Sequence, residues 1–309
     1  GEMLWGEEGV SIDGGNGTHI NACMGIAQLS DDSYVFTWTH CDDEEVLFSI
    51  DVQRVSADGE VLWDVTETRL TDPEGKVTYF WPFVVDAGMG QCILVYTRGS
   101  NNDLYARKID FDGTPVWSED TRIYRGGFLN TPLWGILDVE PSGDGGVIVT
   151  WYDDRHSTNI ESIYMSYVKP NGELAFSEGE EGLKLTYSGC RALSTTCTYD
   201  PHSDSFIAFW REATPGQGNF RAVAQRVSKE GELCWGEEGL VVEDFGEYKS
   251  YGDLKLQSAH EGEIAAFFMR RNQLDYGNVD VCMQIINTDN GSFRWEESPI
   301  LTNTQLPTE

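Results

Sequence analysis

One short motif recurs six times along the chain, and this repetition constrains the fold more than any other feature of the sequence. Each copy has a turn dipeptide, mostly Asp-Gly or Asn-Gly, followed by a short stretch that ends in a large aromatic residue. The aromatic residues lie 54–60 residues apart, at Trp5, Trp63, Trp117, Phe176, Trp235 and Trp295. A repeat of this length predicts an array of equivalent units that bury their apolar faces against their neighbours.

The segments between these motifs predict strands rather than helices. They are four to nine residues long, rich in Val, Ile, Tyr, Phe and Trp, and bounded by Gly, Asp and Asn turns. The second segment of each repeat, such as Val147–Trp151, is apolar on both faces, which indicates a sheet covered on both sides. The Asp-Gly and Asn-Gly dipeptides then favour a tight hairpin into a fourth strand that carries the aromatic residue.

Four strands in about 55–60 residues are typical of one propeller blade. We therefore predict an all-β fold, a β-propeller of five four-stranded blades, with six or more blades in a longer native chain as the alternative. The expected organisation is a single domain over residues 1–309. Its repeats are expected at approximately 6–63, 64–117, 118–176, 177–235 and 236–295, with 1–5 and 296–309 as terminal closing segments.

The charge of the chain excludes some partners. The sequence has 52 acidic and 21 basic residues, a net charge of −31, and such a surface repels nucleic-acid phosphates. No stretch of about 18 apolar residues occurs, so no membrane insertion is expected. We expect a monomer.

Three motifs resemble a repeat common in secreted and surface propellers of bacteria. They are a turn with Trp-Gly-x-x-Gly (Gly231–Val242), a Gly-Gly strand ending in Trp-x-Asp-x-Arg (Gly145–Arg155), and a short strand motif with Arg (Ala224–Ser228). The similarity extends over nearly the whole chain, although the fourth repeat has Phe176 in place of Trp. The resemblance implies an exported or cell-surface bacterial protein, often with a role in surface attachment.

The connections between strands predict which end of the blades binds a ligand. The connections that enter each first strand, and those between second and third strands, are long, and antiparallel alternation places both sets at one end. Long loops on a rigid scaffold commonly carry binding sites. Candidate ligand-binding residues at this end are Tyr79, Trp81, Trp134, Asp153, Asp154, Arg155, Arg191 and Tyr251.

Each candidate also has a structural interpretation. Trp81 and Trp134 lie beside apolar runs and could pack between blades, and the Arg of Asp153-Asp154-Arg155 could join a carboxylate to the next blade instead of binding a cation or a polar ligand. The aromatic series Trp38, Tyr96, Trp151, Trp210 and Phe268 recurs so regularly that we expect it in the core between blades.

No catalytic or metal-binding motif is recognisable. The sequence lacks GxSxG, HExxH, a Walker loop and a dinucleotide fingerprint. No cofactor and no metal site are therefore expected, with a bound cation such as calcium as an alternative. We predict a non-catalytic module that recognises a glycan or a protein through the long-loop face. The alternatives are a glycoside-acting enzyme with carboxylates in a central funnel and a structural module of a larger exported protein.

Overall fold

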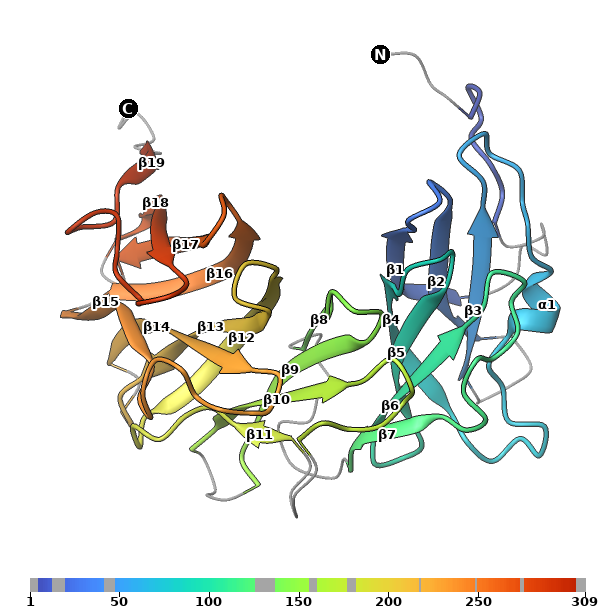
Figure 1. Cartoon of the computed structure of the whole chain (residues 1–309), viewed down its shortest axis with the longest axis horizontal. Coiled ribbons are helices and arrows are strands. Elements are labelled where there is room, and N and C mark those ends of the chain that lie inside the picture. The colour runs from blue at the N-terminus through green and yellow to red at the C-terminus, as the bar shows by residue number, and fades with distance from the viewer. Residues whose placement is uncertain are drawn as a thin grey trace. The chain divides into compact units, whose positions relative to one another are not determined.

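The computed structural model is all-β, with five consecutive antiparallel sheets that form five blades of the β-propeller class (Figure 1). It describes residues 5–12, 20–41, 48–125, 137–155, 160–176, 182–216, 218–247, 249–272 and 275–303. In each sheet the strands follow chain order, so a blade is a simple meander. The chain divides into two compact units, the first with blades 1 and 2 and the second with most of blades 3, 4 and 5.

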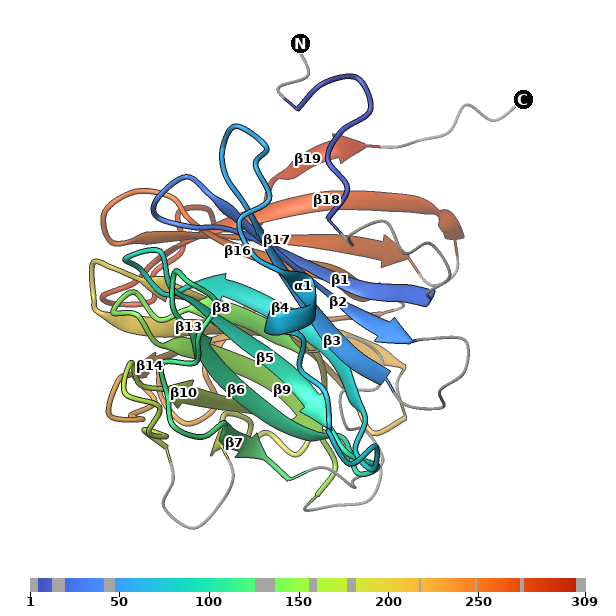
Figure 2. The ribbon, with the colours of Figure 1, turned by 90° about the vertical axis from the view of Figure 1, so that its right-hand side faces the viewer.

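The strands of the first unit have the following bounds. Blade 1 contains β1 (Ile20–Gln28), β2 (Tyr34–Cys41) and β3 (Phe48–Val55), and blade 2 contains β4 (Tyr79–Asp86), β5 (Cys92–Arg98), β6 (Asp103–Ile109) and β7 (Thr121–Tyr124). In blade 1 the place of a fourth strand is taken by Leu70, which pairs with Ile50. The four-residue helix α1 (Val65–Thr68) precedes Leu70 (Figure 2).

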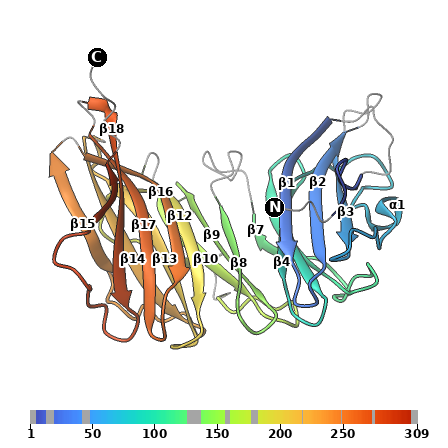
Figure 3. The same cartoon turned by 90° about the horizontal axis from the view of Figure 1, so that it is seen from above.

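The second unit continues the same pattern. Blade 3 contains β8 (Asp138–Pro141), β9 (Val147–Asp153), β10 (Ser162–Val168) and β11 (Leu183–Lys184). Blade 4 contains β12 (Arg191–Asp200), β13 (Ser205–Ala213), β14 (Asn219–Ser228) and β15 (Leu240–Glu247). Blade 5 contains β16 (Lys249–Ser258), β17 (Glu263–Asn272), β18 (Asp275–Asn287) and β19 (Ile300–Asn303), and Figure 3 shows it beside blade 4.

The core lies between the faces of neighbouring blades within each unit. The predicted core series is confirmed, because Trp38, Tyr96, Trp151, Trp210 and Phe268 are each at most 2% exposed. First strands of neighbouring blades also contact one another, β1 with β4 in the first unit and β12 with β8 and β16 in the second. The first strands are therefore the edges at which the blades of each unit converge.

The fourth strand is not the one that the sequence predicts. After the Asp-Gly or Asn-Gly turn the chain pairs with the third strand at a single position, as in Val55 with Val61, and then leaves the sheet. The fourth strand forms later, from the apolar segment that follows the aromatic residue, such as β15 after Trp235. In several repeats the aromatic ring packs against the turn of the next repeat instead. This packing takes the residue out of the ladder of its own sheet, which is why the predicted fourth strand does not form there.

Three of the repeated aromatic residues cover the turn glycine of the next repeat closely. Rings of Trp5, Trp117 and Phe176 lie over Gly59, Gly172 and Gly231, where an added Cβ would stand 3.0–3.1 Å from a ring atom. Each of these glycines has φ near +90°, a conformation that other residues rarely adopt. Only glycine therefore combines the turn geometry with the approach of the ring.

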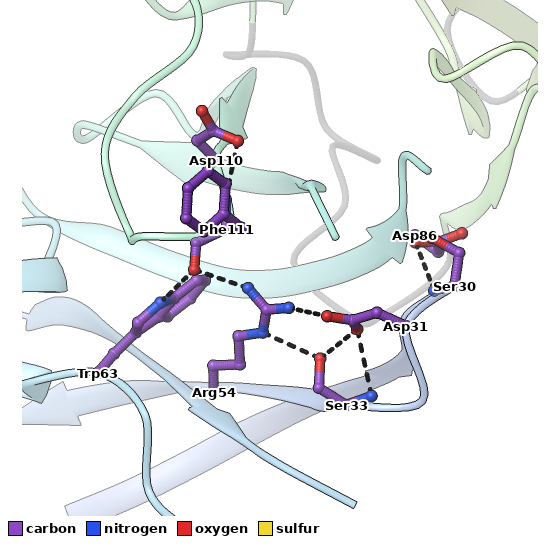
Figure 4. A network of polar contacts seen from close by, with 8 residues as sticks. All are labelled: Ser30, Asp31, Ser33, Arg54, Trp63, Asp86, Asp110 and Phe111. Carbon is purple, nitrogen blue, oxygen red and sulfur yellow. Dashed lines mark hydrogen bonds and ion pairs between the residues drawn. The ribbon is translucent and has the colours of Figure 1, made fainter. Parts of the chain in front are cut away.

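The indole N–H adds a directed bond to this contact. Trp5, Trp63 and Trp117 donate to the carbonyl oxygens of Ala57, Phe111 and Pro170 at 2.9–3.0 Å, in each case two residues before the turn glycine. Figure 4 shows the bond of Trp63 to Phe111 in blade 2, together with the guanidinium of Arg54, which donates to the same oxygen at 2.6 Å.

A glutamine side chain replaces the missing ladder bonds where the aromatic residue leaves its sheet. Gln53 Nε2 donates to the Trp63 carbonyl at 2.8 Å, and Gln53 Oε1 accepts from the Trp63 backbone N–H at 3.1 Å. Gln284 holds Trp295 in the same way, and Gln225 accepts from the Trp235 N–H at 3.0 Å but donates to the carbonyl of the next residue, Gly236, at 2.6 Å. The three glutamines are buried, so their hydrogen bonds are shielded from water.

Removing the ring of Trp63 should destabilise the first unit more than removing its hydrogen bond. We expect Trp63→Ala to cost about 3–5 kcal/mol because the ring is 7% exposed, and Trp63→Phe to cost about 1 kcal/mol for the lost N–H bond. Urea unfolding of both variants measures the difference. Leu62→Ala is the control, since Leu62 is 45% exposed, and equal losses for Leu62→Ala and Trp63→Ala would contradict the prediction.

Candidate functional site

The first strand of four blades contains a β-bulge opposite the core aromatic of the second strand. Pairing shifts there in β1, β4, β12 and β16, across from Trp38, Tyr96, Trp210 and Phe268. Three bulge residues have positive φ, with Trp81 at 53°, Ser194 at 51° and Asp253 at 46°. Positive φ is unfavourable for residues other than glycine, and such strain gathers at ligand sites.

Two of these bulge residues line a hollow at one end of blades 4 and 5, which we call the blade 4–5 hollow. It has a volume of about 270 Å³, near the lower end for ligand sites. Its lining consists of Ser194, Arg211, Ser250, Tyr251, Gly252, Asp253, Met269 and Arg271. The hollow lies where the first strands begin and the second strands end, which is the end that the sequence predicts for binding.

Strands rather than loops form this end of blades 4 and 5. The sequence predicts long connections at Glu243–Gly252 and at Met269–Asn278, but β15 and β16 are separated by one residue, and β17 and β18 by two. This part of the prediction is wrong because the antiparallel ladder continues through polar residues, for example where Arg271 pairs with Ser250. The walls of the hollow are therefore made by strand residues, including two bulges, and not by long loops.

Arg211 is the most unusual residue of the blade 4–5 hollow. Its Nη1 donates to the Tyr251 carbonyl at 2.8 Å, while its Nε is buried with no hydrogen-bond partner. Burial lowers the pKa of the guanidinium, an effect opposed by Tyr152 and Asp253. An arginine stays charged in proteins, so Arg211 is a partly buried cation whose hydrogen-bonding capacity is incompletely used.

Most arginines of this acidic chain have a carboxylate partner, as in the pairs Arg54 with Asp31 and Arg107 with Asp120. Arg98, Arg211, Arg226 and Arg271 are exceptions, with no carboxylate within 4 Å in the part of the chain that the structure describes. Two of these four, Arg211 and Arg271, line the blade 4–5 hollow, together with one acidic residue, Asp253. The hollow is thus a positively charged position in a protein of net charge −31.

Two predicted aromatic residues have buried rings. Tyr251 lines the blade 4–5 hollow but is 1% exposed, packs edge-on against Phe268 and donates its hydroxyl to the Asp244 carbonyl at 3.3 Å. Tyr79 is 7% exposed and lies 5.9 Å from Tyr96 between ring centroids. Neither ring presents an open face on which a sugar could stack.

The Asp153-Asp154-Arg155 segment forms a contact within blade 3. Asp153 is fully buried and accepts the Trp151 indole N–H at 2.9 Å and the Arg155 Nε at 2.9 Å. The Arg155 guanidinium lies 4.1 Å from the centroid of the Tyr164 ring. The carboxylate of Asp153 is engaged by these donors, and Asp154 is partly exposed beside it.

The remaining predicted residues occupy three different environments. Arg191 binds Glu161 with two hydrogen bonds, one of them from Nε to Oε2 at 2.6 Å. Trp81 is partly exposed at the bulge of β4. Trp134 lies outside the described residues.

Sequence reasoning missed Arg211, Ser194 and Asp253 as site residues. The useful signal was the place of Arg211, one residue after the recurring core aromatic of its second strand.

A carboxyl group with altered acidity lies on the first strand of blade 3. Burial, and next the charge of Asp138, raise the pKa of Glu140 to about 7, while Lys255 opposes them. Asp138 is two residues away on the same face of β8, and it accepts from Thr196 Oγ1 at 2.6 Å and from the Cys197 N–H at 2.9 Å. Glu140 does not line the blade 4–5 hollow.

Within the described ranges, no group of three or more His, Cys, Asp and Glu side chains is placed to hold a metal ion. In the first repeat His40 contacts Asp51 at 3.2 Å, and His19, Asp42 and Asp43 lie outside the described residues. None of the helices in the described part of the chain has the length and apolar character needed to cross a membrane.

No protein-family model matches the chain, and no curated protein matches it. Among solved structures, an α-L-arabinanase from Penicillium chrysogenum is similar over 91% of this chain and 80% of its own, at 13% identity and a TM-score of 0.49. A levansucrase from Bacillus subtilis is similar over 97% of this chain and 91% of its own, at 8% identity and a TM-score of 0.43. An exo-β-1,3-galactanase from Clostridium thermocellum is similar over 94% and 64%, at 12% identity and a TM-score of 0.44.

Glu140 should make stability depend on pH. Its pKa is higher in the folded protein than the ordinary 4.5, so its contribution is complete below pH 4.5 and is lost as the pH rises through about 7. We expect Glu140→Gln to match the parent near pH 4.5 and to exceed it above pH 7 by about 1–3 kcal/mol. Urea unfolding at several pH values measures this, with the exposed Glu60→Gln as control. Parallel profiles for the parent and Glu140→Gln would refute it.

Proposed function

We propose that the protein is a non-catalytic glycan-binding module and that the blade 4–5 hollow is its binding site. The observation that carries the proposal is Arg211, a partly buried cation with an unused Nε donor and no carboxylate partner. Burying such a group is costly unless an acceptor compensates it. A ligand that supplies an anionic or strongly accepting oxygen would therefore bind in this hollow. Blade 3 offers no such donor at Arg155, because that guanidinium is already paired with Asp153.

The chemistry of the hollow favours a sugar acid. Arg211 and Arg271 exceed the single charge of Asp253, and guanidinium groups bind carboxylates with paired hydrogen bonds. Ser194, Ser250 and the Gly252 backbone add donors and acceptors that suit sugar hydroxyls. The net charge of −31 repels glycans that carry many negative charges. We therefore propose that the ligand has a single carboxylate within an otherwise neutral glycan.

Other elements of the sequence prediction remain part of this proposal. Trp81, strained and partly exposed at the bulge of β4 in the first unit, is proposed as a separate ligand contact of that unit, and a protein ligand is the alternative to a glycan. Export to the bacterial cell surface follows from the resemblance of the repeats, and a monomeric state is proposed with it. The proposed module uses neither a cofactor nor a metal.

A glycan array with the purified protein tests the proposal. We expect selective binding to glycans with a uronic or other sugar acid, and Arg211→Gln should weaken it by about ten- to hundredfold, because a hydrogen bond to a charged group is worth about 1.5–3 kcal/mol. Arg226→Gln is the matched control, since Arg226 also lacks a carboxylate partner but does not line the hollow. Trp81→Ala tests the second proposed contact in the same assay.

The outcomes separate the hypotheses. Binding that survives Arg211→Gln places the site elsewhere, and a preference for neutral over acidic glycans refutes the carboxylate assignment. If no glycan binds, a protein ligand or a purely structural module in a larger exported protein explains the chain better.

A glycoside-acting enzyme is the second candidate, and Glu140 is the observation that favours it. A carboxyl group with a pKa of about 7 next to a second carboxyl group, that of Asp138, resembles the acid of a carboxylate pair in glycoside hydrolysis. Release of reducing sugar from oligosaccharides, lost in Glu140→Gln and retained in Arg211→Gln, would support catalysis. No release from any oligosaccharide would leave binding as the function.

A further inference from the structure

A second hollow lies in blade 2, in the first unit, and we call it the blade 2 hollow. Its volume is about 440 Å³, and it lies between β6 and the segment that leads to β7. Its lining consists of Arg98, Tyr105, Arg107, Pro115, Trp117, Ser118, Glu119 and Asp120. It shares no residue with the blade 4–5 hollow, so its properties can be tested separately.

Arg98 is the third of the four arginines without a carboxylate partner, and it lines this hollow. Its guanidinium carbon lies 5.6 Å from the ring centroid of Tyr79 and 5.4 Å from that of Tyr105. These contacts hold the cation in place by cation–π attraction. They satisfy none of the guanidinium N–H groups, and the Arg98 side chain makes no hydrogen bond with any described residue. Arg98 is therefore a fixed donor whose acceptors must come from water or from a ligand.

The other charged residues of the blade 2 hollow determine which acceptor fits. Asp120 accepts from Arg107 Nε at 2.5 Å and from the Tyr96 hydroxyl at 2.5 Å. The charges of Asp120 and Arg107 therefore cancel each other. Glu119 is exposed and makes no hydrogen bond or ion pair with any described residue. The open groups are thus one donor, Arg98, and one acceptor, Glu119, whose charges cancel.

Trp117 supplies a rigid apolar wall. Its indole N–H donates to the Pro170 carbonyl at 3.0 Å, and Gly172 lies against its ring, where an added Cβ would stand 3.1 Å away. The ring therefore needs no reordering when a ligand arrives, which lowers the entropic cost of binding. An aromatic wall with one fixed donor and one acceptor is a combination that suits a saccharide, which has C–H faces and hydroxyl groups.

From these contacts we infer that blade 2 carries a second binding site, one for a neutral saccharide, in which Arg98 donates to ring or hydroxyl oxygens and Glu119 accepts from hydroxyl groups. The absence of net charge distinguishes it from the blade 4–5 hollow, where cations predominate. A carboxylate would be attracted by Arg98 but repelled by Glu119, whereas a hydroxyl both accepts and donates.

The experiment uses the full chain with Arg211→Gln as background, so that the blade 4–5 hollow does not contribute. Calorimetric titrations with neutral hexose and pentose oligosaccharides are compared for this protein and for the same protein with Arg98→Gln or Glu119→Gln. We expect at least one neutral oligosaccharide to bind, and each added substitution to weaken it by about tenfold or more. Arg226→Gln and the exposed Glu237→Gln are the matched controls and should leave binding unchanged.

Two results would overturn the inference. One is that no neutral oligosaccharide binds the Arg211→Gln protein, and the other is that binding is equal with and without the added substitutions. Near-ultraviolet circular dichroism checks that Arg98→Gln keeps the packing of Tyr79 and Tyr105. If that variant does not fold, Glu119→Gln decides alone, because Glu119 is exposed and contacts nothing that holds the fold. Failure of the acidic-glycan proposal would leave this test intact.

Discussion

The contact between an aromatic ring and the turn glycine of the following repeat determines most of the architecture. An added Cβ would stand about 3 Å from the ring, which is too close for a side chain, and the turn itself needs a left-handed residue, so both requirements select glycine. Because the ring belongs to one repeat and the glycine to the next, the contacts of Trp117 and Phe176 join neighbouring blades, whereas Trp5 precedes β1 and covers a turn of the blade that follows it. The hydrogen bond from the indole fixes the register between them, as Trp63 does with Phe111.

Much of the fold was predictable from the sequence because the repeat is a local signal. The turn dipeptides, the apolar second strands and the buried aromatic series were found by period and composition alone. The predicted position of the fourth strand is wrong because the Trp motif has the composition of a strand. The Trp63 side chain packs against the turn of the neighbouring blade, and the Gln53 side chain replaces the ladder hydrogen bonds of Trp63. The long connections of blade 5 were misjudged because polar strand ends, such as Arg270 and Arg271, have the composition of loops.

The candidate site was less predictable for a different reason. Aromatic residues such as Tyr79 and Tyr251 were selected by type, but burial of their rings removes them from contact with ligand. The decisive property, an arginine without a carboxylate, depends on which residues become neighbours in three dimensions. Arg155 and Arg211 follow buried second-strand aromatics at nearby positions, yet one is paired with Asp153 and the other is not. Their partners cannot be read from sequence separation.

The displaced aromatic residue also means that the unit of sequence and the unit of structure do not coincide. Blade 2, β4–β7, begins after one aromatic motif and ends after the next, and Trp117 of the motif in its middle covers the turn of the following blade. A piece of chain cut at the repeat boundaries would lose its outer strand, and a piece cut at the sheet boundaries would carry a ring with no turn to cover. Blades of this kind can therefore be exchanged between proteins only as runs of neighbouring blades. A single transplanted blade would need a new neighbour whose turn glycine fits against its aromatic ring.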